Sequence, residues 1–180
     1  MHSSVRASKA DGFALIDLIF VCGIIGLISS IAVPRMLMAR QTASSASAIG
    51  TLRAINSAEL SFAITCGSGF YAPALTTLGV APPGSTEAFI SPDVSSATSV
   101  TKSNYLIQLS GDPFAGAPAS CNGLAAGAAS RGYKAAADPL EPTNLRYFAT
   151  NSIATIWEDT SPMLPTIGEY SDPASGHPLR

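Results

Sequence analysis

The feature that most constrains this chain is an apolar run near its N-terminus. Phe13 to Val33 spans 21 residues, and Asp17 is the only charged residue in it. As a helix this run is about 32 Å long, which matches the ~30 Å hydrocarbon core of a bilayer. Counted from Leu18 instead, the helix reaches only about 24 Å. The run therefore spans a membrane comfortably only with Asp17 at or within the membrane boundary, where a carboxylate normally needs a partner.

Three interpretations of the run are open at this point. A cleaved secretory signal needs a basic start, a short apolar core and a small-residue cleavage site. Arg6, Lys9 and Ser30–Ala32 supply parts of that pattern, but the apolar run is too long and contains an acid. A plain membrane anchor fits the length and leaves Asp17 without a role. The third interpretation places cleavage before the run, directly after Gly12.

The heptapeptide GFALIDL, which begins at Gly12, resembles the processing motif of type IV pilins and type II secretion pseudopilins. Those proteins carry a short polar leader that ends in glycine, then an aromatic residue, then an apolar helix with an acid at its fifth position. The usual acid is glutamate, where this chain has Asp17. Gly26 and Pro34 stand where the family often carries helix-loosening residues. The resemblance implies that a prepilin peptidase cuts between Gly12 and Phe13 and that the new N-terminus of Phe13 is methylated.

This processing would give Asp17 a partner. In a filament, Asp17 of one subunit would lie beside the α-amino group of Phe13 on a neighbour, and each charge favours the ionised form of the other. Such a pair sets the axial register of the subunits more than it adds to stability. The alternative is that Asp17 only compensates the N-terminus of its own helix.

The pattern predicts an α+β fold in which one long N-terminal helix packs on a small antiparallel sheet, as in pilins. That helix is expected from Phe13 to about Thr65, with a bend or local melting near Gly26–Pro34 because proline removes a backbone donor. A stripe at spacings of three and four should pack its second half on the head; its members are Ile49, Leu52, Ile55, Glu59 and Phe62. The predicted parts are a cleaved leader (1–12), a transmembrane and assembly helix (13–34), an amphipathic half (35–66), a head (67–170) and a loose tail (171–180).

The head is predicted to be a long loop followed by a sheet of about four strands. Residues 67–103 are rich in Pro, Gly, Ser and Thr, with a short coil only at LTTLG, and long loops of this kind often form functional surface. Strand signals follow. They are Tyr105–Leu109, Gly132–Ala136 and a hairpin of Leu145–Thr150 with Ile153–Glu158.

Of the three cysteines, Cys22 lies in the apolar run and two lie outside it. The absence of a CxxC pair and of a nearby histidine argues against zinc. In an exported chain the outer pair predicts a Cys66–Cys121 disulfide, which contributes roughly 4 kcal/mol in the chain-entropy model. Two unrelated buried thiols are the alternative.

Neither catalysis nor nucleic-acid binding is indicated. The net charge is −2 without basic blocks, and the two histidines, His2 and His177, lie near the two ends of the chain. Neither a metal site nor a cofactor is therefore expected, and the chain is not predicted to be an enzyme.

The leading hypothesis is a structural subunit of a helical filament, in which contacts that do not close generate an open helix. The expected partners are other copies of the chain, a prepilin peptidase, an inner-membrane assembly platform with its ATPase, and membrane lipid before assembly. The precursor would cross the cytoplasmic membrane once, and the filament would be an extracellular pilus (fimbria) or a periplasmic pseudopilus for protein secretion. The alternatives are a pseudopilin or minor filament subunit, and a single-pass membrane-anchored or secreted binding protein with a mature N-terminus at Met1 or after Ala32.

Overall fold

The computed structural model describes residues 15–179. Its helices are α1 (Leu15–Thr65), α2 (Leu75–Leu78) and α3 (Pro92–Ser95). Its strands are β1 (Ser99–Lys102), β2 (Tyr105–Ser110), β3 (Lys134–Pro139), β4 (Tyr147–Asn151), β5 (Ile156–Asp159) and β6 (His177–Pro178). The chain divides into two compact units, Met1–Arg40 and Gln41–Arg180.

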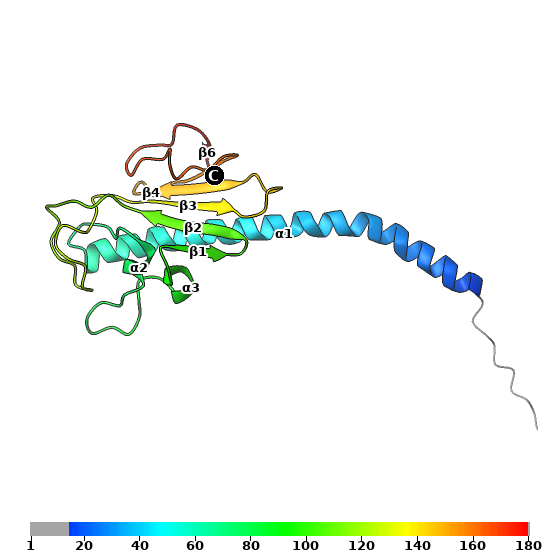
Figure 1. The fold of residues 1–180 in the computed structure, drawn as a ribbon, viewed down its shortest axis with the longest axis horizontal. Helices are drawn as coiled ribbons and strands as arrows, with labels where there is room; N and C mark the ends of the chain where they lie inside the picture. The colour runs from blue at the N-terminus through cyan, green and yellow to red at the C-terminus, as the bar shows by residue number, and fades with distance from the viewer. Residues whose placement is uncertain (1–14, 180) are drawn as a thin grey trace, which may run out of the picture. The chain divides into compact units, whose positions relative to one another are not determined.

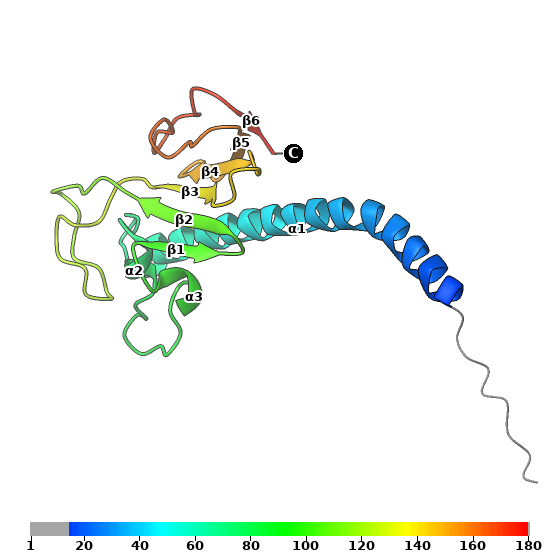
Figure 2. The same cartoon turned by 45° about the vertical axis from the view of Figure 1, so that its right-hand side comes forward.

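The strands of the second unit form one antiparallel sheet with the order β1-β2-β3-β4-β5-β6 (Figures 1 and 2). Each strand therefore pairs with its neighbour along the chain, and the register is continuous, with Ile107 opposite Ala137 and Ala137 opposite Phe148. The predicted α+β architecture, a long N-terminal helix packed on a small antiparallel sheet, is confirmed. The sheet has six strands where about four were predicted.

The main core lies between the second half of α1 and one face of the sheet. The buried residues of α1 recur at spacings of three and four, which gives the helix a single apolar stripe. On β2, Tyr105, Ile107 and Leu109 are buried and alternate with partly exposed residues, as expected for a strand with one face on a core. Phe62 and Phe148 are among the largest fully buried side chains of this cluster.

A smaller cluster covers the opposite face of the sheet. Ala136 belongs to it, whereas its strand neighbours Ala135 and Ala137 belong to the main core, so β3 is buried on both faces. Met163 and Ile167, from the segment after β5, pack over this second face. The six-strand sheet is thus covered on one side by α1 and on the other by residues of its own C-terminal region.

Several predicted boundaries differ from the structure. The strand expected to start at Gly132 starts at Lys134, and the hairpin strands are β4 and β5 with slightly shifted ends. The stretch expected to be loop contains α3 and β1 besides the predicted coil, which is α2. β1 is short, polar and at the sheet edge, so its strand character depends on pairing with β2 and not on apolar alternation.

The tail expected to be loose contains β6. His177 and Pro178 pair with β5, and the amide of Leu179 donates to the carbonyl of Ile156 at 2.8 Å. A proline is compatible with this position because β6 is an edge strand.

Helix α1 ends at Thr65, close to the predicted end. The amide of Gly67 donates to the carbonyl of Phe62 at 2.7 Å, and that of Gly69 donates to Ala63 at 2.9 Å. Gly69 has a φ of 90°, a conformation that favours glycine. These bonds terminate the helix beside Cys66, whose disulfide partner is Cys121.

Candidate functional site: the apolar half of α1

The first half of α1 exposes its apolar side chains. Every residue from Leu15 to Arg40 is exposed, with Leu15 at 78% and Phe20 at 70%. The other large apolar side chains exposed here are Ile16, Leu18, Ile19, Val21, Ile24, Ile25, Leu27, Ile28, Ile31, Val33, Met36, Leu37 and Met38. Isolated exposed apolar residues are common, but an apolar surface of this extent marks a site that lipid or another protein covers.

By length and composition, α1 is the one helix among residues 15–179 that can cross a membrane. Its most apolar stretch of 18 residues has a mean hydropathy of 2.5, and none of it is buried. Ser30 fits this environment because its hydroxyl donates to the carbonyl of Leu27 at 2.8 Å, within the helix itself. The first half of α1 thus has the properties of a membrane anchor.

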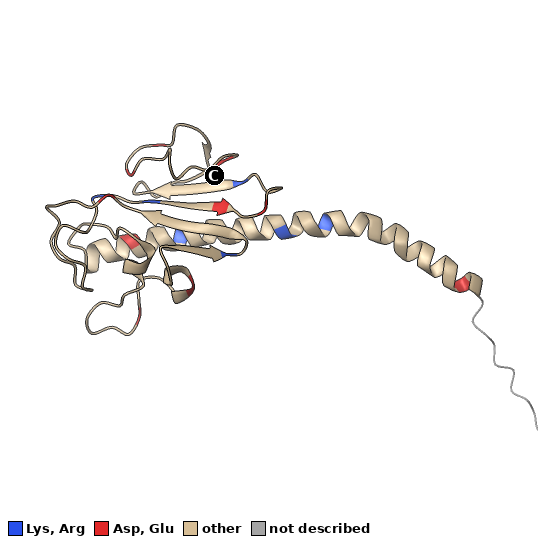
Figure 3. Ribbon diagram, in the orientation of Figure 1, with Lys and Arg blue, Asp and Glu red and all other residues tan. Residues whose placement is uncertain are grey.

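Asp17 is an exposed residue in the first turn of α1 as described. From there to Arg35 the helix carries no charge, which Figure 3 shows as an uninterrupted tan stretch. A carboxylate in a first turn interacts favourably with the helix N-terminus. Gly12 and Phe13 lie outside the described residues, so the cleavage site and the Asp17–Phe13 pair stay predictions.

Gly26 and Pro34 both lie inside continuous α-helix. Of the predicted bend or local melting, local melting is not seen in the single chain. A proline removes one intrahelical hydrogen bond, and the flanking turns keep theirs. At Gly26 no atom lies within 4 Å of where a Cβ would be. Nothing within residues 15–179 requires a glycine there. Its role in loosening the helix, which the family resemblance implies, stays a prediction.

The Cys66–Cys121 disulfide forms, as predicted, with Cα atoms 4.8 Å apart. It joins the end of α1 to the loop between β2 and β3, and the amide of Cys121 also donates to the carbonyl of Cys66 at 3.1 Å. Cys22 is a free, exposed cysteine within the apolar half of α1.

Glu59 is a buried acid that the sequence pattern placed on the helical stripe without predicting its environment. Its exposure is 0%, and its Oε2 accepts a hydrogen bond from the amide of Ala72 at 2.9 Å. Burial raises the pKa of Glu59 to about 8, and the Ala72 hydrogen bond opposes that shift. At neutral pH this carboxyl is therefore mostly protonated.

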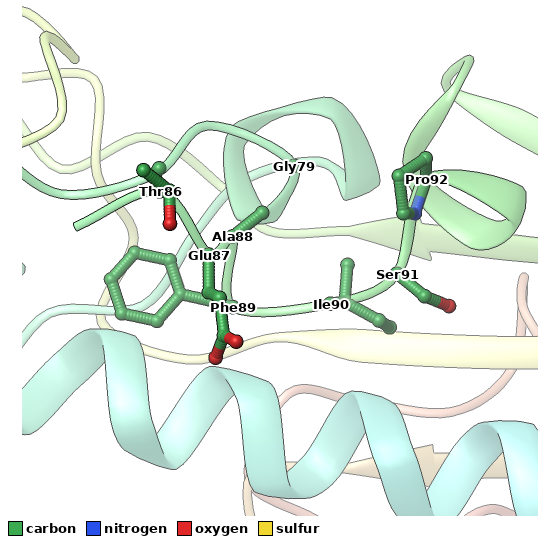
Figure 4. A pocket seen from close by; sticks show the side chains of 9 residues that line it. Gly79, Thr86, Glu87, Ala88, Phe89, Ile90, Ser91 and Pro92 are labelled. Carbon is green, nitrogen blue, oxygen red and sulfur yellow. The ribbon is translucent and has the colours of Figure 1, made fainter.

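A shallow pocket of about 530 Å³ lies on the loop between α2 and α3 (Figure 4). The lining polar side chains are Thr86, Glu87 and Ser91, and neither histidine nor cysteine is among the lining residues. Within residues 15–179, no group of three or more His, Cys, Asp or Glu side chains is arranged to hold a metal ion. The apolar half of α1 is consequently the stronger candidate for a functional site.

Comparison with protein-family models, with curated proteins and with solved structures finds no match for this chain.

Proposed function

We propose that this chain is a structural subunit of a type IV pilus-like helical filament. A prepilin peptidase cuts it between Gly12 and Phe13, and the mature chain is held in the membrane by the apolar half of α1 until it is assembled. In the filament the same half of α1 packs against neighbouring copies.

The observation that carries this proposal is the division of α1 into two halves of opposite exposure. Residues 15–40 are exposed and largely apolar, whereas later positions such as Leu52, Ile55 and Phe62 are fully buried under the sheet. A helix of this kind gives every subunit the same apolar surface for lipid or for other subunits, together with a head that folds around the other half. Asp17 marks the start of that surface with one charge, which supports a specific electrostatic partner over simple anchoring.

A pseudopilin or a minor filament subunit would share the processing and the packing, and would differ in copy number and in the secretion system that uses it. A single-pass membrane-anchored binding protein would use the same helix as an anchor and would give Asp17 no partner. The first two alternatives belong to the proposed class; the third does not.

The test is the N-terminal residue of the mature protein, measured by mass spectrometry on membranes and on sheared filaments from cells that produce the full chain. The expected N-terminus is Phe13, with or without one added methyl group. A mature chain that begins at Met1 or Val33 would refute the filament proposal and favour an anchored or secreted domain.

Asp17→Ala and Asp17→Glu form a matched pair for the assembly step. We expect both to be cleaved, Asp17→Glu to assemble and Asp17→Ala to assemble poorly. Loss of one partner of a buried ion pair costs about 3–5 kcal/mol. Equal filament yields from the two variants would contradict a charge pair at this position.

A further inference from the structure

Glu59 is a buried acid for which the proposed function has no use. Its side chain lies in the core between α1 and the rest of the head, and its Oε1 is buried without a hydrogen-bond partner. Its other oxygen accepts one hydrogen bond from the described part of the chain, from the Ala72 amide. An ionised carboxylate offers about four acceptor sites on its two oxygens, and a buried one needs most of them filled; here one hydrogen bond is present.

Among residues 15–179, no positively charged group contributes to the pKa shift of Glu59. Tyr133, which precedes β3, is 2% exposed. Burial raises the pKa of Tyr133, and the negative charge of an ionised Glu59 raises it further. Tyr71 packs against Tyr133 with ring centroids 5.2 Å apart. The hydroxyl of Tyr133 donates to Oδ1 of Asn56, one turn before Glu59 on α1. Arg53 on α1 and Arg131 before β3 are both exposed.

Ala72 belongs to an irregular segment, Ser68–Ala74, that connects the end of α1 to α2. Besides the bond to Glu59, reciprocal backbone hydrogen bonds of 2.8 and 3.0 Å join Tyr71 to Ser130, and Pro73 accepts a bond from the Gly111 amide at 3.2 Å. The other walls of the core are α1, the sheet, and the α2–α3 region, which contributes Leu75, Ile90 and Val94. Ser68–Ala74 is irregular, and its Ala72 amide is bonded to the Glu59 carboxyl, so local opening of this segment is the opening that lets water reach that group.

We propose that Glu59 is a proton-controlled latch for the Ser68–Ala74 segment. With the carboxyl protonated, the segment is closed over it and the Ala72 amide is bound. When the segment opens, water reaches the carboxyl, Glu59 releases its proton, and the ionised side chain opposes closure. The sheet and the Cys66–Cys121 disulfide stay in place during this opening.

The direction of the pH dependence follows from the two protonation equilibria. The closed state binds the Glu59 proton with a pKa of about 8, and the open, hydrated state has the ordinary value of 4.5. Acid therefore favours the closed state. Between these two pKa values the opening equilibrium constant rises about tenfold per pH unit, and above the upper value it becomes constant. Tyr133 stays protonated throughout this range because burial raises its pKa.

The test is hydrogen exchange by NMR on the full chain in detergent micelles at pH 5.5, 6.5 and 7.5, corrected for the intrinsic exchange rates. The reporters are the amides of Tyr71 and Ala72, and the reference amides are those of β2 and β3. Glu59→Gln keeps the size and the acceptor for Ala72 but does not titrate, and Glu87→Gln is a matched control at an exposed loop position. The carboxyl carbon shift of Glu59 in the unmodified chain gives its pKa directly.

We expect the protection of Tyr71 and Ala72 to fall about 100-fold from pH 5.5 to 7.5 in the unmodified chain and in Glu87→Gln, and to stay constant in Glu59→Gln. These two amides should also exchange faster than those of β2 and β3, since the opening is local. Protection equal to that of the sheet would overturn the latch, because Glu59 would then be reached only by global unfolding. A pH-independent protection in the unmodified chain would overturn it as well. If Glu59→Gln does not fold, the unmodified chain decides. A Glu59 carboxyl that titrates near the ordinary glutamate pKa refutes the latch. A titration near pH 8, together with faster and pH-dependent exchange at Tyr71 and Ala72, supports it.

Discussion

Removal of the Cys66–Cys121 disulfide is expected to lower the free energy of unfolding of the head by about 4 kcal/mol. The two cysteines are 55 residues apart. In the chain-entropy model, a loop of this length removes about 14 cal/mol/K from the unfolded chain, which is about 4 kcal/mol at 25 °C. Domains of this size are typically stable by only about 5–15 kcal/mol, so the loss is a large share of the total.

The assay is a urea titration of the full chain in detergent micelles, followed by the fluorescence of its single tryptophan, Trp157, which packs against the second core cluster. With a slope of about 2 kcal/mol per molar urea, the midpoint of Cys66→Ala/Cys121→Ala should fall by about 2 M. Cys22→Ala, which leaves the disulfide intact, is the control and should unfold as the unmodified chain does. If the midpoint of the double variant decreased by less than about 0.5 M, the loop-entropy reasoning for this disulfide would be refuted.

Three further predictions concern the core of the head. Phe62→Ala removes a fully buried ring from α1 and should cost about 3–5 kcal/mol in a urea titration; a loss below about 1 kcal/mol would contradict its place in the core. Tyr105→Phe deletes a buried hydroxyl that donates to the carbonyl of Arg146 at 3.0 Å and accepts from Asn144 at 2.9 Å. It should cost about 1–3 kcal/mol, because Asn144 loses its acceptor, and an unchanged midpoint would exclude this network as a source of stability. Folding raises the pKa of Glu59, so the stability that it contributes is full below about pH 4.5 and decreases by about 1.4 kcal/mol per pH unit up to about pH 8. The free energy of global unfolding of Glu59→Gln should lack this pH dependence. An equal pH dependence in both proteins would assign it to other groups.

The parts of the fold that could be predicted from the sequence are those that local pattern determines. The spacing of Leu52, Ile55 and Phe62 predicts one buried face of the helix, whatever the position of the sheet. The length of the apolar run can be counted in the sequence. β2 was predicted because the run Tyr105–Leu109 contains residue types that favour strands, such as tyrosine and isoleucine. β1 and β6 were not predicted, because they are short edge strands that exist through their pairing with β2 and β5.

The environment of Glu59 shows a second limit of sequence patterns. A glutamate at helical spacing is compatible with an exposed position and with a buried one, and the difference here is made by Ala72, 13 residues further along the chain. The disulfide was easier to predict because only two cysteines lie outside the apolar run, so one pairing was available.

The order of the strands has a consequence for how the head is made. Since each strand pairs only with the one before and the one after it, every new strand meets its neighbour as soon as it is available. Helix α1 precedes all of them and provides the apolar face against which β2 and β3 can pack. The head can therefore form from its N-terminal to its C-terminal side while the chain is still being synthesised. β6 is the last strand of the sheet along the chain, and its pairing is made by His177 and Pro178. A chain interrupted before that point would lack one edge of its sheet and keep the order of the rest.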